Sequence, residues 1–173
     1  MNIPFECLSP DIDETMREFE RPLELAGRLA AEKAGVVSSQ KPEAIVIGSD
    51  QLAVFSGRIL GKPGYHAAAL EQLSSFSGQV VEFLTAVSVQ CLASGFNEVY
   101  IDTTRVKFRH LQTDEIERYL QAESPYDCAG AFKAEALGIT LFDSISSEDP
   151  TALIGLPLIR TAAMLRRAGL SLP

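Results

Sequence analysis

The sequence predicts an α/β fold in which a mixed, twisted sheet is covered by helices. Residues 45–51 form an apolar run short enough for a buried strand. Residues 80–91 and 98–109 are rich in Val, Phe, Tyr and Thr, which predicts a long antiparallel pair. Residues 22–35 instead carry apolar side chains at helical spacing. Strands and helices are therefore expected to follow one another along a single chain.

The elements are predicted in order from the N-terminus. Residues 3–8 are expected to form a strand and residues 9–15 an acidic loop. Pro22 suits the first turn of a helix that runs to Gly35, and the strand that follows leads into Asp50, with Gly48 allowing a sharp exit. Thr113 opens a later helix with a pattern like a capping box, although its acid, Glu117, comes one place late. The other expected elements are a hairpin of residues 52–55 and 58–60, helices at 65–76, 113–122 and 157–168, a loop at 130–138 and a short strand at 139–142.

The length and the charge of the chain limit its class. With 173 residues, 46% of them hydrophobic, one domain covering 1–173 is expected. A net charge of −8 argues against nucleic-acid polymers and anionic membranes as partners, because both need a basic patch. A small phosphorylated ligand is still compatible with a few local lysines and a divalent cation. No stretch is apolar enough to cross a bilayer and the first residues lack a signal core, so a cytoplasmic location is expected.

Cysteine and histidine offer little chemistry. Cys7, Cys91 and Cys128 are an odd number without a CxxC pair, which fits neither a disulfide framework nor a zinc site. Neither His66 nor His110 lies near Cys128 in sequence, so a structural role is favoured for that thiol over a nucleophilic one. The two histidines receive no predicted role.

Asp50 and Lys62 are the first candidate site residues. Asp50 is predicted at the carboxyl end of a buried strand, where open α/β sheets build their sites, and Lys62 follows one hairpin later in Gly61-Lys62-Pro63. A carboxylate beside a lysine suits metal-assisted attack on a phosphate ester. The alternative is a strand that ends in a turn, with Asp50 capping the backbone and Lys62 solvated.

Several separated segments together resemble the Maf family of nucleoside triphosphate pyrophosphatases, in the family's order and over nearly the whole chain. The resemblance implies the fold of that family, which is similar to inosine triphosphate pyrophosphatases. The segments are Pro10-Asp11-Ile12-Asp13-Glu14-Thr15, Arg28-Leu29-Ala30-Ala31-Glu32-Lys33-Ala34, Gly48-Ser49-Asp50-Gln51, Gly61-Lys62-Pro63, Leu73-Ser74-Ser75-Phe76-Ser77-Gly78, Val106-Lys107-Phe108-Arg109, Cys128-Ala129-Gly130-Ala131-Phe132-Lys133 and Gly155-Leu156-Pro157-Leu158.

Two segments distinguish branches of the family. Gly48-Ser49-Asp50-Gln51 and Phe132-Lys133-Ala134-Glu135 differ from the branch that acts on pyrimidine triphosphates and resemble the branch that hydrolyses 7-methyl-GTP to 7-methyl-GMP and pyrophosphate. The methylated guanine carries a delocalised positive charge, which a carboxylate or an aromatic face favours. Glu135 is therefore expected to accept hydrogen bonds from the base and Gln51 to contact another base edge. The alternative for both is solvated loop polarity.

The resemblance also implies roles for individual residues. Asp50 is expected to take a proton from the water that attacks the α-phosphorus. Asp50 and Glu14, with Asp13 as a neighbour, are the expected ligands of a divalent cation, Mg²⁺ or Mn²⁺. The expected phosphate contacts are Lys33, Lys62 and Lys133. For Phe132, a base platform and core packing are both open. A solvated acidic loop and surface lysines are the alternatives for the others.

One part of the family pattern is absent from this sequence. Family members begin with a strand that leads to Ser-x-Ser-Pro-x-Arg-Arg, a phosphate-binding loop, and neither precedes residue 3 here. The expectation is either a start assigned in the wrong place or a truncated protein. Two alternatives to hydrolysis of 7-methyl-GTP follow: a noncatalytic or weakly active nucleotide-binding protein with a regulatory role, and a pyrophosphatase for another nucleotide. A homodimer is expected because symmetric pairs are the commonest assembly.

Overall fold

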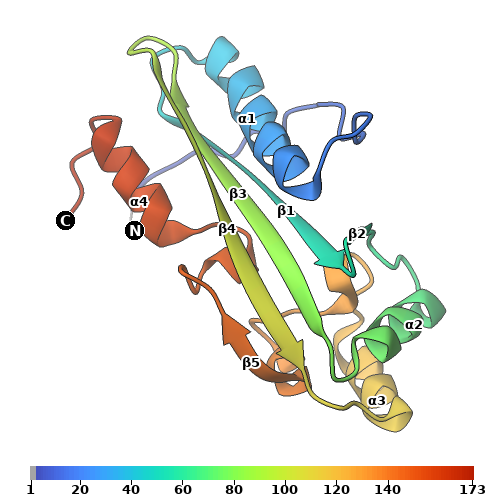
Figure 1. Cartoon of the computed structure of the whole chain (residues 1–173). Helices are drawn as coiled ribbons and strands as arrows, with labels where there is room; N and C mark the ends of the chain where they lie inside the picture. The colour runs from blue at the N-terminus through green and yellow to red at the C-terminus, as the bar shows by residue number, and fades with distance from the viewer. Residues whose placement is uncertain (1–2) are drawn as a thin grey trace. The chain divides into compact units, whose positions relative to one another are not determined.

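The computed structural model describes residues 3–173, which form a five-stranded sheet with neighbouring strands running antiparallel (Figure 1). The α/β class and the helical cover are confirmed, whereas the expected mixed sheet is corrected to an antiparallel one. The strand order is β2-β1-β3-β4-β5. The strands are β1 (Val46–Phe55), β2 (Arg58–Leu60), β3 (Val80–Cys91), β4 (Phe96–Phe108) and β5 (Phe142–Ser146).

The four predicted helices are present, but the predicted end of the first at Gly35 is wrong, because that helix continues to Gln40. They are α1 (Pro22–Gln40), α2 (His66–Phe76), α3 (Thr113–Glu123) and α4 (Leu158–Arg167), with 3₁₀ turns η1 (Ala129–Ala131), η2 (Leu137–Leu141) and η3 (Ala152–Ile154). Helix α3 begins at Thr113 as expected, but its N-cap is Gln112, whose backbone N–H donates to the Glu115 carboxylate at 2.9 Å. Among residues 3–173, no helix combines the length and the apolar character that a membrane span needs.

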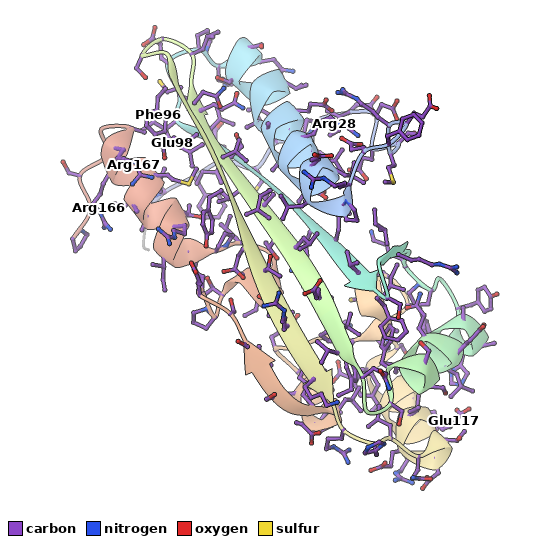
Figure 2. The ribbon with its side chains drawn as sticks, viewed as in Figure 1. Arg28, Phe96, Glu98, Glu117, Arg166 and Arg167 are labelled. Atoms are coloured by element: carbon purple, nitrogen blue, oxygen red, sulfur yellow. The ribbon has the colours of Figure 1, made fainter. Side chains whose placement is uncertain are left out.

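The chain forms two compact units, and β1, β3 and β4 each contribute to both. The first unit contains the described residues up to Gln51, residues 85–102 and residues 149–173. One face of α1 is buried in it, and α4 packs Met164 and Leu165 against Val87 and Val89 of β3. Arg167 at the end of α4 forms an ion pair with Glu98 at 2.6 Å (Figure 2). The expectation of a single domain stays a prediction.

The second unit, residues 52–84 and 103–148, has an aromatic core. Phe108 of β4 lies at its centre, with ring centroids 5.3 Å from Phe76, 5.7 Å from Phe132 and 5.1 Å from Phe142. Phe83 contacts Phe132 edge to face at 5.1 Å. Such edge-to-face pairs add to the stabilisation that burial of the rings provides.

Three predicted elements are wrong. Residues 3–17 have no regular secondary structure, so the strand at 3–8 is absent, and Phe5 is 83% exposed. Residues 139–141 belong to η2, and the strand begins only at Phe142. The strand into Asp50 does not stop there: β1 continues without a break to Phe55 and pairs with β2 from Ala53 onward. Asp50 therefore lies within a strand and not at its carboxyl end.

Candidate active site

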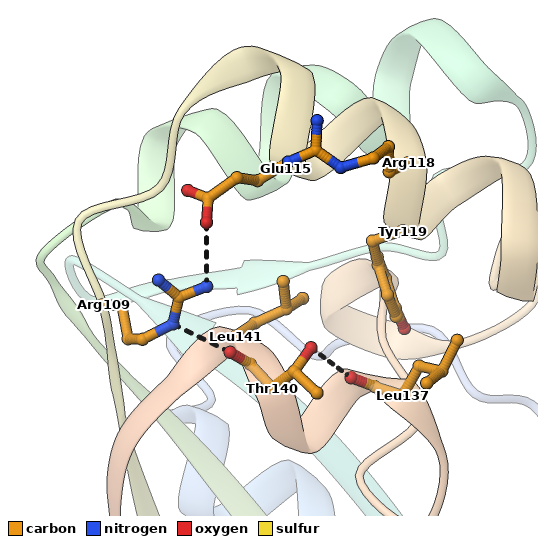
Figure 3. Close-up of a pocket in the computed structure, with 7 residues that line it drawn as sticks. All are labelled: Arg109, Glu115, Arg118, Tyr119, Leu137, Thr140 and Leu141. Atoms are coloured by element: carbon orange, nitrogen blue, oxygen red, sulfur yellow. Dashed lines mark hydrogen bonds and ion pairs between the residues drawn. The ribbon is translucent and has the colours of Figure 1, made fainter.

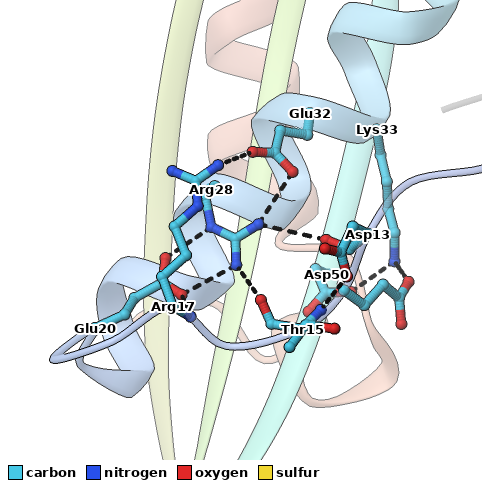
Figure 4. Close-up of polar contacts among 9 residues, drawn as sticks. Asp13, Thr15, Arg17, Glu20, Arg28, Glu32, Lys33 and Asp50 are labelled. Carbon is cyan, nitrogen blue, oxygen red and sulfur yellow. Dashed lines mark hydrogen bonds and ion pairs between the residues drawn. The ribbon is translucent and has the colours of Figure 1, made fainter.

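Lys33, Asp50 and Glu14 come together in the first unit (Figure 4). The Lys33 Nζ donates to Asp50 Oδ1 at 2.7 Å and lies 2.8 Å from Glu14 Oε1. The Asp50 side chain is 11% exposed, that of Lys33 23% and that of Glu14 61%. Two carboxylates thus converge on one cationic group that is largely removed from water, which is the ion-pair environment expected of a reactive carboxylate.

The close packing of α1 on β1 makes this contact possible. A Cβ at Gly48 would lie 2.4 Å from the Ala30 carbonyl oxygen and 2.6 Å from the Ala34 backbone nitrogen, so only glycine fits. The predicted role of Gly48 as a sharp exit is therefore wrong, because Gly48 lies inside β1 and admits the helix. Lys33, next to Ala34 on α1, consequently reaches Asp50 two residues beyond Gly48.

The electrostatics of Lys33 favour its charged form. Burial by itself lowers the pKa of Lys33, but hydrogen bonds to Asp50 and Glu14 outweigh that effect, so the pKa is raised above its usual value. Lys33 is therefore a permanent cation at neutral pH, and it is available to a negatively charged group that competes with the two carboxylates.

Arg28, which has no role predicted from the sequence, fixes the loop that carries Glu14. Its guanidinium donates to Glu20 at 2.7 Å, to Glu32 at 3.1 Å and to the backbone carbonyl of Thr15 at 2.9 Å (Figure 4). The hydrogen bond from Arg28 lowers the pKa of Glu20 to about 2. Its i,i+4 spacing to Glu32 was the one local signal of this network.

The acidic loop does not offer all its carboxylates to one point. Asp13 Oδ1 accepts from the Thr15 backbone N–H at 2.9 Å, which makes a local turn. Hydrogen bonds from the side chain and then the backbone of Thr15 lower the pKa of Asp13. Glu14, and not Asp13, is the residue that contacts Lys33. The expected role of Glu14 as a metal ligand stays a prediction.

Gln51 and Ser49 point to the turn between residues 152 and 155. Gln51 Nε2 lies 2.8 Å from Thr85 Oγ1, 3.0 Å from the Ala152 carbonyl oxygen and 3.2 Å from that of Leu153. Ser49 Oγ lies 2.7 Å from the carbonyl oxygens of both Ala86 and Gly155. The predicted contact of Gln51 with a base stays a prediction. Because these contacts use the Nε2 donors, Gln51 would contact a base either through Oε1 as an acceptor or after its side chain moves.

The other predicted site residues lie in the second unit. Lys62 and Glu135 are exposed. Lys133 donates its backbone N–H to the Tyr119 hydroxyl at 3.1 Å, and its Nζ lies 3.4 Å from the Glu123 carbonyl oxygen. Phe132 is 5% exposed and its ring is part of the aromatic core, which is what the packing alternative requires. The predicted nucleotide contacts of these four residues stay predictions.

The carboxylates of Asp50 and Glu14 were tested as ligands of a divalent cation. Residues 3–173 contain no group of three or more His, Cys, Asp or Glu side chains arranged to hold a metal. Two carboxylates do converge, however, at a point now taken by the Lys33 ammonium, and their oxygens are the donors that Mg²⁺ and Mn²⁺ prefer. The donor set fits a hard cation that completes its shell with water or phosphate oxygens.

A separate cavity of about 250 Å³ lies in the second unit beside α3 (Figure 3). Arg109 on its wall is held by Glu115 at 3.3 Å and by the Thr140 carbonyl oxygen at 2.8 Å. None of the predicted site residues lines this cavity. Its lining residues are Arg109, Glu115, Arg118, Tyr119, Leu137, Thr140 and Leu141.

Comparison with known proteins agrees with the family resemblance. The family model described as Maf-like protein matches residues 1–168, so the chain belongs to the Maf family. A protein of Albidiferax ferrireducens named 7-methyl-GTP pyrophosphatase is 52% identical over 170 residues, which cover 98% of this chain and 85% of the relative. Proteins of the same name from Polaromonas sp. and Xanthomonas axonopodis pv. citri are 54% and 51% identical, over 99% and 100% of this chain and 78% and 90% of the relatives.

Proposed function

We propose that this Maf protein is a nucleoside triphosphate pyrophosphatase that hydrolyses 7-methyl-GTP to 7-methyl-GMP and pyrophosphate. The observation that carries the proposal is the nearly buried carboxylate of Asp50, paired with Lys33, in a chain whose relatives are named for this activity. A carboxylate held in this way can accept a proton from water while its side chain stays in place.

The reaction is proposed as attack of water on the α-phosphorus. Asp50 takes the proton from the attacking water on Oδ2, since Oδ1 accepts from Lys33. The bond between the α-phosphorus and the bridging oxygen breaks, and pyrophosphate leaves with the electron pair. Lys33, Lys62 and Lys133 are proposed to stabilise the charge on phosphate oxygens, each through its ammonium group.

A divalent cation belongs to the proposal. Asp50 and Glu14 would hold Mg²⁺ or Mn²⁺, and the bound cation would supply further stabilisation of negative charge on the phosphates. Lys33 would hold the two carboxylates in place before the cation and substrate arrive, because its ammonium group contacts both.

Recognition of the base is proposed for Gln51 and Glu135, whereas Phe132, which is 5% exposed, is proposed to pack the aromatic core. The exposed carboxylate of Glu135 suits the cationic 7-methylguanine, and its replacement by glutamine removes the charge while keeping the shape. A cytoplasmic location is proposed because all three cysteines are free thiols, as a reducing compartment allows. A homodimer is proposed on general grounds and is checked by sedimentation.

The experiment is a panel of nucleoside triphosphates with Mg²⁺ or Mn²⁺, scored by pyrophosphate release. The expected result is a higher kcat/KM for 7-methyl-GTP than for GTP and UTP. In Glu135→Gln, the kcat/KM for 7-methyl-GTP divided by that for GTP should fall about tenfold. Preference for an unmethylated nucleotide would contradict the proposed substrate. No pyrophosphate release from any nucleotide that binds would favour the noncatalytic alternative.

A further inference from the structure

The loop from Gly61 to Gly64, which carries Lys62, is fixed at both ends. The Gly61 carbonyl oxygen accepts from Gln72 Nε2 of α2 at 3.0 Å, and the Gly64 N–H donates to the Tyr126 carbonyl oxygen at 2.9 Å. Pro63 is buried between these anchors. The backbone of Lys62 is therefore restrained while its side chain is exposed to solvent.

His66, the first residue of α2, contacts Tyr126, whose carbonyl oxygen accepts the hydrogen bond from Gly64. Its Nε2 lies 2.8 Å from Glu117 Oε2 on α3, and its Nδ1 lies 3.1 Å from the Tyr126 hydroxyl. A carboxylate only accepts, so Nε2 carries the hydrogen, and Nδ1 shares a hydrogen bond with the tyrosine hydroxyl. The two rings also contact edge to face, with centroids 6.2 Å apart. Nδ1 and the ring thus contact Tyr126, while Nε2 anchors the imidazole to Glu117.

We propose that His66 is a positioning residue that, through Tyr126 and with support from Glu117, fixes the Gly61–Gly64 loop and so orients Lys62 for a triphosphate group. The inference rests on the proposed function in one respect, namely that Lys62 contacts phosphate. A flexible lysine loses conformational freedom when it binds a phosphate, and a fixed backbone reduces that loss. His66 acts through the backbone hydrogen bond between Gly64 and Tyr126 and needs no contact with the nucleotide.

A double-mutant cycle between residues 66 and 62 tests the proposal. The probe is inorganic tripolyphosphate, whose Kd is measured by calorimetry on the full chain. His66→Phe keeps a ring but removes both nitrogens, and it is expected to weaken binding about fivefold in the wild type but less than twofold in the Lys62→Ala background. His110→Phe, a change at the other histidine of the chain, is the matched control and is expected to leave the Kd unchanged in both backgrounds.

Two further variants keep the test independent of folding. Tyr126→Phe removes only the hydroxyl and is expected to weaken binding about twofold, and His66→Gln, whose amide can donate to Glu117, is expected to recover part of the loss. Amide exchange at Gly64 should be faster in His66→Phe. The inference would be overturned if His66→Phe weakened tripolyphosphate binding equally in both backgrounds or left amide exchange at Gly64 unchanged. It would also be overturned if Lys62→Ala did not change the Kd for tripolyphosphate.

The same proteins, assayed with 7-methyl-GTP, separate this inference from the proposed reaction. A wild type that releases no pyrophosphate but shows the predicted binding cycle would contradict the reaction and support the positioning role. A wild type that is active but shows no coupling between residues 66 and 62 would support the reaction and contradict the positioning role.

Discussion

The two compact units bury different kinds of side chain along the same strands. In the first unit, residues 49–51 of β1 carry polar side chains that are bonded to Lys33, to Thr85 and to the turn at 152–155. In the second unit, the corresponding interior is a cluster of phenylalanine rings around Phe108. Buried polar groups are stable only when they are paired, so residues 49–51 depend on specific partners, whereas the phenylalanine cluster depends on shape and volume.

This difference separates the two kinds of task that the proposed reaction needs. A half-buried, paired carboxylate suits proton transfer, and the first unit supplies it in Asp50. An apolar framework suits the rigid support of groups at the surface, and the second unit carries Lys62 and Glu135 there. Substitutions in the first unit should therefore change the chemistry, and those in the core of the second unit should change stability.

The largest effect is expected from Asp50→Asn. The amide keeps the shape but cannot accept the proton, so kcat/KM for 7-methyl-GTP should fall by a factor of about 10²–10⁴. Circular dichroism and Tm should show a folded protein. Asp143→Asn, at an exposed aspartate on β5, is the control and should retain full activity. Near wild-type turnover by Asp50→Asn would remove this residue from the mechanism.

The next effect tests whether Phe132 packs the core or supports the base. Phe132→Ala should cost about 3–5 kcal/mol of stability in urea unfolding, because it leaves a cavity among three other rings. The milder Phe132→Leu is used for kinetics, and the ratio of kcat/KM for 7-methyl-GTP over GTP should not change. Phe83→Leu is the matched core substitution. A selectivity loss specific to residue 132 would show a base contact and break the division between the units.

How far local sequence determines structure also differs between the two regions. The helices and the β3–β4 pair were predictable because their apolar periodicity is local. Residues 3–8 have an apolar pattern suited to a strand, but pairing depends on a partner that such a pattern does not contain. The polar side chains of Asp50 and Gln51 predict the end of a strand at this point. The contacts that allow them inside β1 come from Lys33 and residues 152–153, distant in sequence.

A smaller effect is expected where α1 meets β1. Gly48→Ala places a methyl group against the backbone of α1, so the helix must shift and stability should fall by about 1–3 kcal/mol. Activity should fall as well, because the shift separates Lys33 from Asp50. Gly35→Ala is the control on the same helix: its Cβ would lie 3.6 Å from Gln90 Oε1, and it should stabilise by about 0.5–1 kcal/mol. If Gly48→Ala changed neither stability nor activity, the close approach of α1 to β1 would not be what positions Lys33 beside Asp50.

The smallest effect concerns the acid stability of the loop that carries Glu14. Because the hydrogen bond from Arg28 holds the pKa of Glu20 at about 2 in place of 4.5, the folded state is favoured above pH 4.5 and this contribution is lost as the pH falls towards 2. The Tm of the wild type should therefore fall more steeply across this window than that of Glu20→Gln, which has no carboxylate to titrate. Glu18→Gln, at an exposed neighbour, should follow the wild type. Parallel curves for the wild type and Glu20→Gln would mean that the Arg28 network contributes nothing to the first unit, and the contrast between paired polar groups and apolar packing would lose its main support.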